Sequence, residues 1–414
     1  MRVPGDKSIS HRALMLAALG NGRSRIRGLL CSADLESTAE VLRRLGAPVP
    51  PLSPVEVVID GVGLRGLQTP SAVLDCGNSG TTTRLMAGIV AGAGLTARFI
   101  GDASLSTRPM RRVAKPLEAM GAIVELPAHG GLPMIVTGSA LQGVTWHPDM
   151  ASAQVKSAIL LAGLVADVPV EVHEPVATRD HTERMLRARG ADVRADGRSV
   201  TFIPGARLEA IDVDVPGDPS SAAFFAGLAA LGVTSSLVLE GVGVNPARVG
   251  AFRVLKRMGA GVKYGPTLDQ GGEPVTMITV TPGTLRGVVI TEQEVPSLID
   301  ELPLIACVAA RASGETRITG AAELRVKESD RIHTVVSNLR ALGVDAEELP
   351  DGMVVRGSDK PLTGAVRTHA DHRIAMAFGV LGALPGNAIT MDDPSCVTVS
   401  YPTFWDELAD VRHR

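Results

Sequence analysis

The chain repeats a short stretch that first occurs as Val41-Leu42-Arg43-Arg44-Leu45-Gly46-Ala47. Similar stretches follow at 116–122 (PLEAMGA), 185–191 (MLRARGA), 254–260 (VLKRMGA) and 338–344 (NLRALGV). Their glycines are 75, 69, 69 and 84 residues apart, and a degenerate sixth copy covers 404–411. An apolar turn closed by glycine is typical of a helix end whose C′ residue is left-handed. Each copy therefore predicts a helix ending at a glycine, with a strand after it.

A second element recurs in the same rhythm, with a polar start followed by a run of small apolar residues. Residues 13–20 (ALMLAALG) and 157–164 (SAILLAGL) are examples. A helix that is apolar nearly all round is a buried helix. The copies begin near Ser8, Gly80, Gln154, Ser221, Asp300 and His372. We therefore predict six units, each with two helices separated and followed by strands.

The units also group into halves. The stretch Val3-Pro4-Gly5-Asp6-Lys7-Ser8 returns 212 residues later as VPGDPS at 215–220. Proline followed by glycine suits a turn, after which Asp or Ser caps a helix. We interpret the pair as crossovers near 4–5 and 216–217. They predict a first domain of residues 5–216 and a second of 217–414 together with 1–4, each built from three units.

Composition excludes several classes of protein. Of 414 residues, 45% are hydrophobic and 21% are charged, which excludes a disordered chain. The net charge of −3 argues against a protein that mainly binds nucleic acid. Only 3% of residues are aromatic, which argues against base-stacking platforms.

The cysteines indicate the redox compartment, and the longest uncharged run shows whether a membrane span is predicted. Four cysteines lie far apart and form no CxxC pair, so we expect no zinc site and free thiols in a reducing cytoplasm. Mean hydropathy is +0.20. The longest uncharged run, 219–239, contains a Gly-Val-Thr-Ser-Ser turn and predicts a buried helix and a strand rather than a membrane span.

Basic and hydroxyl residues gather at the starts of the small-residue helices. Helix N-termini carry unpaired N–H groups and partial positive charge, so added Lys, Arg, Ser and Thr make anion sites. The starts in question read KSISHR (7–12), DCGNSGTTTR (75–84), SAQVK (152–156) and HADHR (369–373). Ordinary capping with solvated basic side chains explains any one of them, whereas the set indicates one or two anionic ligands. No GxxxxGK[ST] pattern occurs, so a Walker-type nucleotide site is not predicted.

The second half adds an acidic helix start and a basic pair. Asp300 enters an apolar helix, where partial burial raises the pKa of a carboxyl and suits a general base. A plain N-cap is the alternative for Asp300. Lys327 and Arg331 share one face if their segment is helical, and then clamp a phosphate or carboxylate. A solvated helix start is the alternative for this pair.

Taken together, these motifs resemble one family over essentially the whole chain. PGDKSISHR (4–12) is similar to the opening signature of the 3-phosphoshikimate 1-carboxyvinyltransferase (EPSP synthase) family. GNSGTTTR (77–84) resembles its phosphoenolpyruvate loop, RVKESDR (325–331) its second signature and DHRIAM (371–376) its late arginine motif.

The resemblance implies a fold and a reaction. The fold is α/β (α+β): a two-domain inside-out α/β barrel of six βαβαββ repeats, three per domain, with buried helices. The reaction moves the enolpyruvyl group of phosphoenolpyruvate to the 5-hydroxyl of 3-phosphoshikimate by addition and elimination in the cleft between two closing domains. It is a step of chorismate and aromatic amino acid biosynthesis, the shikimate pathway, and needs no metal or organic cofactor.

The resemblance also implies site residues. Those for 3-phosphoshikimate are Lys7, Ser8, Arg12, Ser152, Ala153, Gln154, Arg179, Asp300 and Lys327. Those for phosphoenolpyruvate are Lys7, Gly80, Arg108, Gln154, Arg331 and Arg373. Asp300, Glu328 and Lys7 are the implied catalytic residues: Asp300 accepts the 5-hydroxyl proton, and Glu328 exchanges a proton with the methylene carbon. Glyphosate is the implied inhibitor, which Gly80 leaves room to admit, and we expect a monomer.

Three departures from the family pattern, and two rivals, remain open. Relatives usually carry about one strand more before Val3, some have a lysine near Tyr401, and some have asparagine where this chain has Glu323. The sister family, UDP-N-acetylglucosamine enolpyruvyl transferase, usually has a reactive cysteine in the loop that corresponds to 101–110, and none occurs here. A non-catalytic anion-binding protein of the same fold is the other rival, and the carboxylates Asp300 and Glu328 argue against it.

Overall fold

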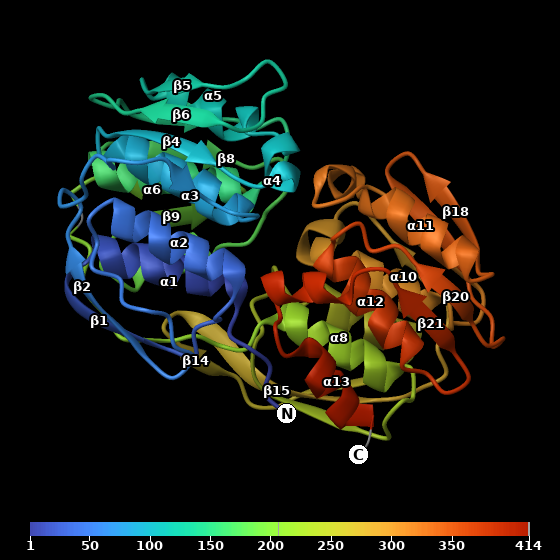
Figure 1. Cartoon of the computed structure of the whole chain (residues 1–414). Coiled ribbons are helices and arrows are strands. Elements are labelled where there is room, and N and C mark those ends of the chain that lie inside the picture. The colour runs from blue at the N-terminus through green and yellow to red at the C-terminus, as the bar shows by residue number, and fades with distance from the viewer. Residues whose placement is uncertain (206, 413–414) are drawn as a thin grey trace. The chain divides into compact units, whose positions relative to one another are not determined.

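The computed structural model describes residues 1–205 and 207–412, and the chain divides into two compact units (Figure 1). The N-terminal unit comprises Gly5–Val215 with Gln270–Glu273. The C-terminal unit comprises Met1–Pro4, Pro216–Asp269 and Pro274–Arg414. The described residues of each unit form three sheets.

The N-terminal unit alternates helices and strands. Its helices are α1 (Lys7–Leu19), α2 (Ala33–Arg44), α3 (Gly80–Gly92), α4 (Ala103–Thr107), α5 (Arg111–Ala119), α6 (Ala153–Ala166) and α7 (His181–Arg187). Its strands are β1 (Asn21–Arg27), β2 (Val57–Val62), β3 (Leu74–Asp75), β4 (Thr96–Ile100), β5 (Ile123–Glu125), β6 (Met134–Thr137), β7 (Val144–Trp146), β8 (Val170–His173), β9 (Asp192–Asp196), β10 (Ser199–Ile203) and β11 (Val213–Asp214). The sheet orders are β11-β1-β2, β3-β4-β6-β5 and β7-β8-β10-β9.

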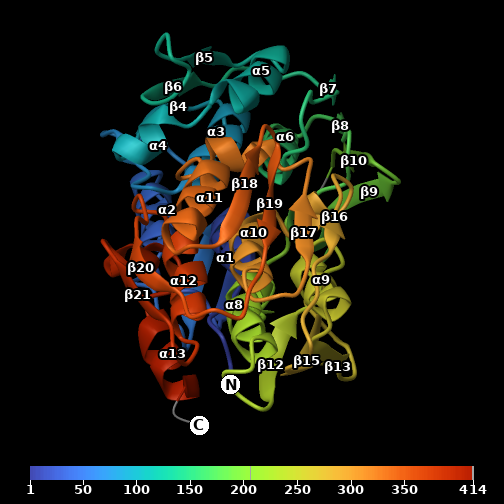
Figure 2. The ribbon, with the colours of Figure 1, turned by 90° about the vertical axis from the view of Figure 1, so that its right-hand side faces the viewer.

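The C-terminal unit follows the same plan. Its α-helices are α8 (Pro219–Ala230), α9 (Gly250–Met258), α10 (Leu302–Ala309), α11 (Arg331–Ala341), α12 (His372–Gly382) and α13 (Phe404–Arg412), with short 3₁₀ helices η1 (Val295–Ser297), η2 (Ile299–Glu301), η3 (Ala322–Val326) and η4 (Pro394–Val399). Its strands are β12 (Leu237–Gly243), β13 (Gly261–Tyr264), β14 (Leu268–Gln270), β15 (Glu273–Thr281), β16 (Val289–Ile290), β17 (Glu315–Ile318), β18 (Asp345–Leu349), β19 (Gly352–Arg356), β20 (Thr363–Val366) and β21 (Ala388–Met391). The sheets are β12-β15-β13 with β14 beside β15, β16-β17-β19-β18, and β20-β21. Figure 2 shows β16, β17, β19 and β18 side by side.

The predicted fold class is confirmed, and the sheets refine the repeat. Three sheets have the full pattern, in which a parallel pair is followed by two antiparallel strands: β3–β6, β7–β10 and β16–β19. In the first copy, β11 from the end of the unit lies parallel to β1. In the fourth, residues 1–4 lie beside β12, through a parallel bridge between Arg2 and Glu240. The sixth copy has only the parallel pair β20 and β21.

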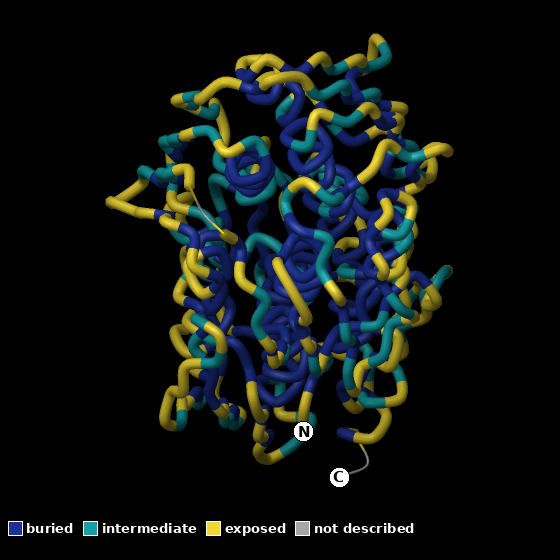
Figure 3. Tube along the Cα trace, turned by 90° about the vertical axis from the view of Figure 1, so that its left-hand side faces the viewer, coloured by how far each residue is buried: buried dark blue, intermediate teal, exposed yellow. Residues whose placement is uncertain are grey.

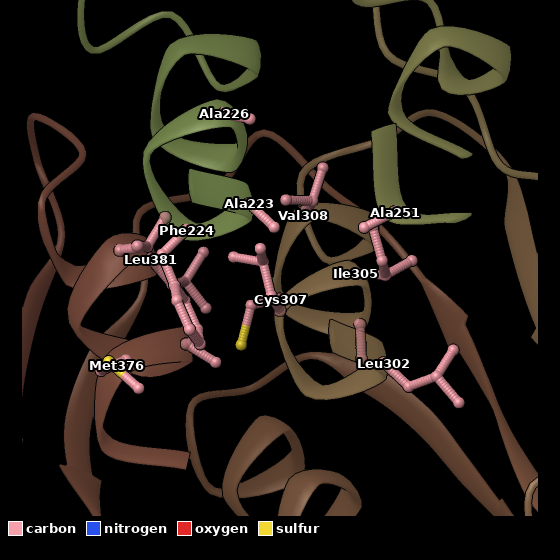
Figure 4. Close-up of a cluster of buried hydrophobic side chains, with 14 of the residues drawn as sticks. Ala223, Phe224, Ala226, Ala251, Leu302, Ile305, Cys307, Val308, Met376 and Leu381 are labelled. Carbon is pink, nitrogen blue, oxygen red and sulfur yellow. The ribbon is translucent and has the colours of Figure 1, made fainter. Parts of the chain in front are cut away.

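Both recurring helix types form where the sequence predicts them. The amphipathic helices α2, α5, α7, α9 and α11 are followed by glycines with positive φ, namely Gly46 (89°), Gly121 (108°), Gly190 (87°), Gly259 (114°) and Gly343 (84°). The small-residue helices α1, α3, α6, α8, α10 and α12 are buried along almost their whole length (Figure 3). Figure 4 shows α10 packed beside α8 and α12, with Cys307 among apolar side chains. Burial raises the pKa of that thiol.

The uncharged run at 219–239 forms α8 and the start of β12, as predicted. Among the described residues, no helix is both long enough and apolar enough to cross a bilayer.

Candidate active site

The implied site residues fall into two sets, one in each unit. The N-terminal half-site consists of Lys7, Ser8, Arg12, Gly80, Arg108, Ser152, Ala153, Gln154 and Arg179. The C-terminal half-site consists of Asp300, Lys327, Glu328, Arg331 and Arg373.

Capped helix starts organise the N-terminal half-site. Side-chain oxygens of Asp6, Ser79 and Ser152 accept hydrogen bonds from backbone N–H groups in the first turns of α1, α3 and α6. A cap of this kind stabilises a helix by about 1 kcal/mol and fixes where it begins. The caps therefore hold the polar first turns of these buried helices, where Lys7, Ser8, Gly80 and Gln154 lie.

Two basic residues of α1 form ion pairs or hydrogen bonds with other side chains and the backbone of the protein. Lys7 forms an ion pair with Asp34 of α2. Arg12 is 4% exposed and donates hydrogen bonds to Thr182 Oγ1 (2.6 Å), Ser157 Oγ (2.8 Å) and the carbonyl oxygen of Ser8 (2.9 Å). Burial lowers the pKa of Arg12 to about 10, so the guanidinium stays charged at neutral pH.

The segment around Gly80 carries a second basic cluster. Arg84 Nη1 donates to Gln154 Oε1 (2.6 Å), and Gln154 Nε2 donates to Thr81 Oγ1 (3.0 Å). Arg108 donates from Nη2 to Asn78 Oδ1 (2.6 Å) and from Nη1 to the Asn78 carbonyl oxygen (3.3 Å). Hydrogen bonds therefore connect the first turn of α3 to Gln154, and the residue Asn78 just before α3 to Arg108.

Gly80 lies directly against these guanidinium groups. A Cβ built on Gly80 would lie 2.8 Å from Arg84 Nη1 and 3.6 Å from Arg108 Nη1. A methyl group there would crowd the guanidinium of Arg84 and lie within contact distance of that of Arg108.

Arg179 lies half-buried in the segment between β8 and α7. Its positive charge acts to lower the pKa of Arg12. Arg12 and Arg179 together supply two positive charges, which favour a dianionic ligand such as a phosphate monoester.

The C-terminal half-site centres on Arg331, the first residue of α11. Arg331 is 1% exposed, and its Nε and Nη2 lie 2.8 and 3.1 Å from the two carboxylate oxygens of Asp371. Its Nη2 also donates to Glu328 Oε2 (2.7 Å). Burial acts to lower the pKa of Arg331, but the charges of Asp371 and Glu328 raise it above its usual value. Burial acts to raise the pKa of Asp371, but Arg331 lowers it below its usual value.

Two cations face the carboxylate of Asp300, which lies in η2 just before α10. Asp300 Oδ1 is 3.4 Å from Arg331 Nη1 and 3.7 Å from Lys327 Nζ. Arg373 Nη1 is 3.2 Å from Glu301 Oε1. An acid, two of its cationic neighbours and a further arginine are thus gathered in one place.

Residues 327–330 are not helical, so Lys327 and Arg331 do not share a helix face. Lys327 has extended backbone after η3, and α11 begins only at Arg331. Asp330 accepts from the N–H of His333 and caps α11, which stops the helix from extending backwards. Lys327 and Arg331 still converge, because both approach Asp300.

The structure shows three further side chains in contact with implied site residues, and the sequence analysis gave them no role. They are Asp34, Arg84 and Asp371. Asp371 caps α12, binds Arg331, and accepts from Ser329 Oγ (2.9 Å). Arg84 and Asp371 stand inside motifs that the sequence singled out, so proximity to a motif was the available signal. Asp34 has no such signal, since its partner Lys7 is far away in the sequence. Among the described residues, no three His, Cys, Asp or Glu side chains are grouped so that they could hold a metal ion.

Known proteins resemble the whole chain. A family model described as EPSP synthase (3-phosphoshikimate 1-carboxyvinyltransferase) matches residues 1–408. Proteins named 3-phosphoshikimate 1-carboxyvinyltransferase from Sulfurihydrogenibium sp. (strain YO3AOP1) and Persephonella marina are 49% and 48% identical, each over 99% of this chain and over 96% and 95% of their own lengths.

Two solved structures are also similar to the chain over nearly its whole length. An EPSP synthase structure from Acinetobacter baumannii superposes with a TM-score of 0.87 at 43% identity, covering 99% of this chain and 94% of the other. The enolpyruvyl transferase NikO from Streptomyces tendae has a TM-score of 0.78 at 21% identity over 99% of this chain and 94% of its own, which shows a shared fold. On the match along its whole length, the chain belongs to the EPSP synthase (3-phosphoshikimate 1-carboxyvinyltransferase) family.

Proposed function

We propose that the residues of the two half-sites bind the substrates of the family's reaction and carry out its proton transfers. As a member of that family the chain is a transferase of the shikimate pathway. It moves the enolpyruvyl group of phosphoenolpyruvate to 3-phosphoshikimate in aromatic amino acid biosynthesis. The sister reaction, with UDP-N-acetylglucosamine as acceptor, is not favoured, because the family model and the named relatives are those of the shikimate enzyme.

The acceptor 3-phosphoshikimate uses basic and hydroxyl groups of the first turns. We assign its contacts to Lys7, Ser8, Arg12, Ser152, Ala153, Gln154, Arg179, Asp300 and Lys327. The buried guanidinium of Arg12, which three hydrogen bonds orient, supports a phosphate site. Two unit charges 4 Å apart interact by about 4 kcal/mol at an effective dielectric of 20, so a few such cations offset the repulsion between two anionic substrates.

The donor phosphoenolpyruvate uses a second set of cations. We assign its contacts to Lys7, Gly80, Arg108, Gln154, Arg331 and Arg373. The two guanidinium groups beside Gly80 support an anion at that position. Arg331 is rigidly held by Asp371, so it is preorganised to bind a carboxylate or phosphate.

Proton transfers fall to Asp300, Glu328 and Lys7. In the addition step, Asp300 accepts the 5-hydroxyl proton as the acceptor oxygen bonds to C2 of phosphoenolpyruvate, and C3 gains a proton. In the elimination step, C3 loses a proton, the C2–O bond to phosphate breaks and phosphate leaves. Glu328 serves C3, with Lys7 as the other acid-base group. The observation that carries this assignment is the position of the Asp300 carboxylate beside Lys327 and Arg331.

We also infer three properties of the working protein: inhibition by glyphosate at the donor site, a monomeric state and a cytoplasmic location. The cysteines Cys31, Cys76, Cys307 and Cys396 are all free, which suits a reducing compartment. Gel filtration at assay concentration tests the monomer.

Phosphate release with different acceptors tests the proposed function. We expect release when phosphoenolpyruvate is combined with 3-phosphoshikimate, also in the presence of EDTA. Release with UDP-N-acetylglucosamine instead would reverse the choice of acceptor. Tight binding of 3-phosphoshikimate with no release would favour the non-catalytic alternative.

A further inference from the structure

Two hydroxyl groups from different helices fix the guanidinium of Arg12. Ser157 belongs to α6 and Thr182 to α7, and both accept from Arg12, at 2.8 and 2.6 Å. The two hydroxyl oxygens are themselves 2.7 Å apart. Both residues are buried, with exposures of about 1%. Three of the five N–H groups of Arg12 are donated to Ser8, Ser157 and Thr182, which orients the plane of the guanidinium.

The hydrogen bonds have one consistent direction. An arginine only donates, so both hydroxyl oxygens are acceptors towards Arg12. Ser157 Oγ donates its proton to the carbonyl oxygen of Ala153 (2.7 Å), and the Thr182 hydroxyl then donates to Ser157 Oγ. The chain of hydrogen bonds therefore runs from Arg12 through Thr182 and Ser157 to the backbone of Ala153.

A buried ion cluster supports the same pair of helices. Lys156 Nζ lies 2.8 Å from Glu174 Oε2 and 2.6 Å from Glu183 Oε1. The three side chains are at most 4% exposed. Separating buried charges leaves an uncompensated ion, which costs several kcal/mol. Lys156 adjoins Ser157 in the sequence, and Glu183 adjoins Thr182. The ion cluster therefore keeps the two hydroxyl groups close to each other.

We propose that Ser157 and Thr182 are positioning residues for binding of 3-phosphoshikimate, acting through Arg12. Their hydroxyl pair joins three segments that carry acceptor contacts: the first turns of α1, the start of α6 at Ala153, and the approach to α7 at Arg179. The inference rests on the proposed placement of Arg12 in the acceptor site. Because both hydroxyl groups are buried, the proposed role is exerted through Arg12 and not by contact with the substrates.

Single substitutions test the pair. We expect Thr182→Val and Ser157→Ala each to raise the dissociation constant and KM for 3-phosphoshikimate about tenfold, because Arg12 loses an oriented acceptor. We expect KM for phosphoenolpyruvate, measured at saturating acceptor, to change less than about twofold. Thr182→Ser keeps the hydroxyl and restores acceptor binding. Ser24→Ala is the control, since the buried Ser24 hydroxyl has no hydrogen-bond partner among the described residues.

A double-mutant cycle separates positioning from general damage. In an Arg12→Ala background, Thr182→Val adds no further loss of acceptor affinity if it acts through Arg12. An equal loss in both backgrounds overturns the proposal, as does failure of Thr182→Ser to restore binding. Normal acceptor affinity of Arg12→Ala overturns the placement of Arg12 itself. If Arg12→Ala binds weakly but neither hydroxyl variant does, only the positioning role is overturned.

Discussion

Asp371 binds Arg331 with both carboxylate oxygens, at 2.8 and 3.1 Å, although the two residues are 40 positions apart in the chain. The same carboxylate caps α12 through the backbone N–H of Arg373 (2.9 Å). One acidic side chain therefore fixes the implied donor-binding Arg331 directly and starts the helix that carries a second such arginine, Arg373.

Asp371→Asn keeps an oxygen for the helix cap but removes the charge opposite Arg331. We expect the free energy of unfolding to fall by about 3 kcal/mol, because breaking a buried pair leaves a buried charge unpaired. We also expect KM for phosphoenolpyruvate to rise more than KM for 3-phosphoshikimate. Urea unfolding and steady-state kinetics measure the two effects. Asp345→Asn, which breaks an exposed pair with Arg356, serves as the control and should change neither quantity.

Gly80→Ala probes the room beside the donor loop. The added methyl lies 2.8 Å from Arg84 Nη1, so the arginine tip must move and the space for an anion shrinks. We expect the glyphosate inhibition constant to rise about tenfold or more, with a smaller rise in KM for phosphoenolpyruvate. Equal glyphosate inhibition constants for wild type and variant would show that glyphosate does not bind beside Gly80. Gly265→Ala, whose Cβ meets its nearest atom at 3.5 Å, is the matched control.

His11 makes stability depend on pH. Burial, and then the charges of Lys7 and Arg12, lower its pKa well below 6.5, and its Nδ1 lies 2.7 Å from Thr38 Oγ1. Below about pH 6.5 the unfolded chain takes up a proton that the folded protein does not, so stability is lost as pH falls through this value. The loss reaches at most about 1.4 kcal/mol per pH unit.

Urea unfolding at pH 7 and pH 5 measures this contribution. We expect His11→Asn to lose less stability than wild type between the two pH values, while the exposed His129→Asn follows wild type. Parallel pH profiles for wild type and His11→Asn would contradict the assignment.

Lys156→Met tests the buried ion cluster under α6 and α7. Removing the lysine leaves Glu174 and Glu183 close together without their cation. We expect a loss of about 3 kcal/mol in the free energy of unfolding. Glu174→Gln added to Lys156→Met should recover part of the loss, because one buried negative charge disappears. A second substitution that adds to the damage would show that the cluster is not coupled.

The sequence predicts local features of this fold well and long-range pairs poorly. Gly46, Gly121 and their counterparts are read correctly because a left-handed helix end is a property of a few neighbouring residues. The buried helices are read correctly because their composition leaves no polar face. The pairs Lys7–Asp34 and Arg331–Asp371 depend on how whole repeats pack, which no local pattern encodes. The spacing of Lys327 and Arg331 would suit one helix face, but the segment is not helical for a local reason. Asp330 caps α11, so the helix begins only at Arg331.

Phosphate release by wild type and Asp300→Asn, with both substrates present, tests whether Asp300 is the general base of the reaction. We expect release by wild type only when phosphoenolpyruvate and 3-phosphoshikimate are combined. We also expect a fall of about 1000-fold in kcat for Asp300→Asn, with 3-phosphoshikimate still bound, because the general base is lost. Turnover of Asp300→Asn within about tenfold of wild type would contradict the role given to this carboxylate.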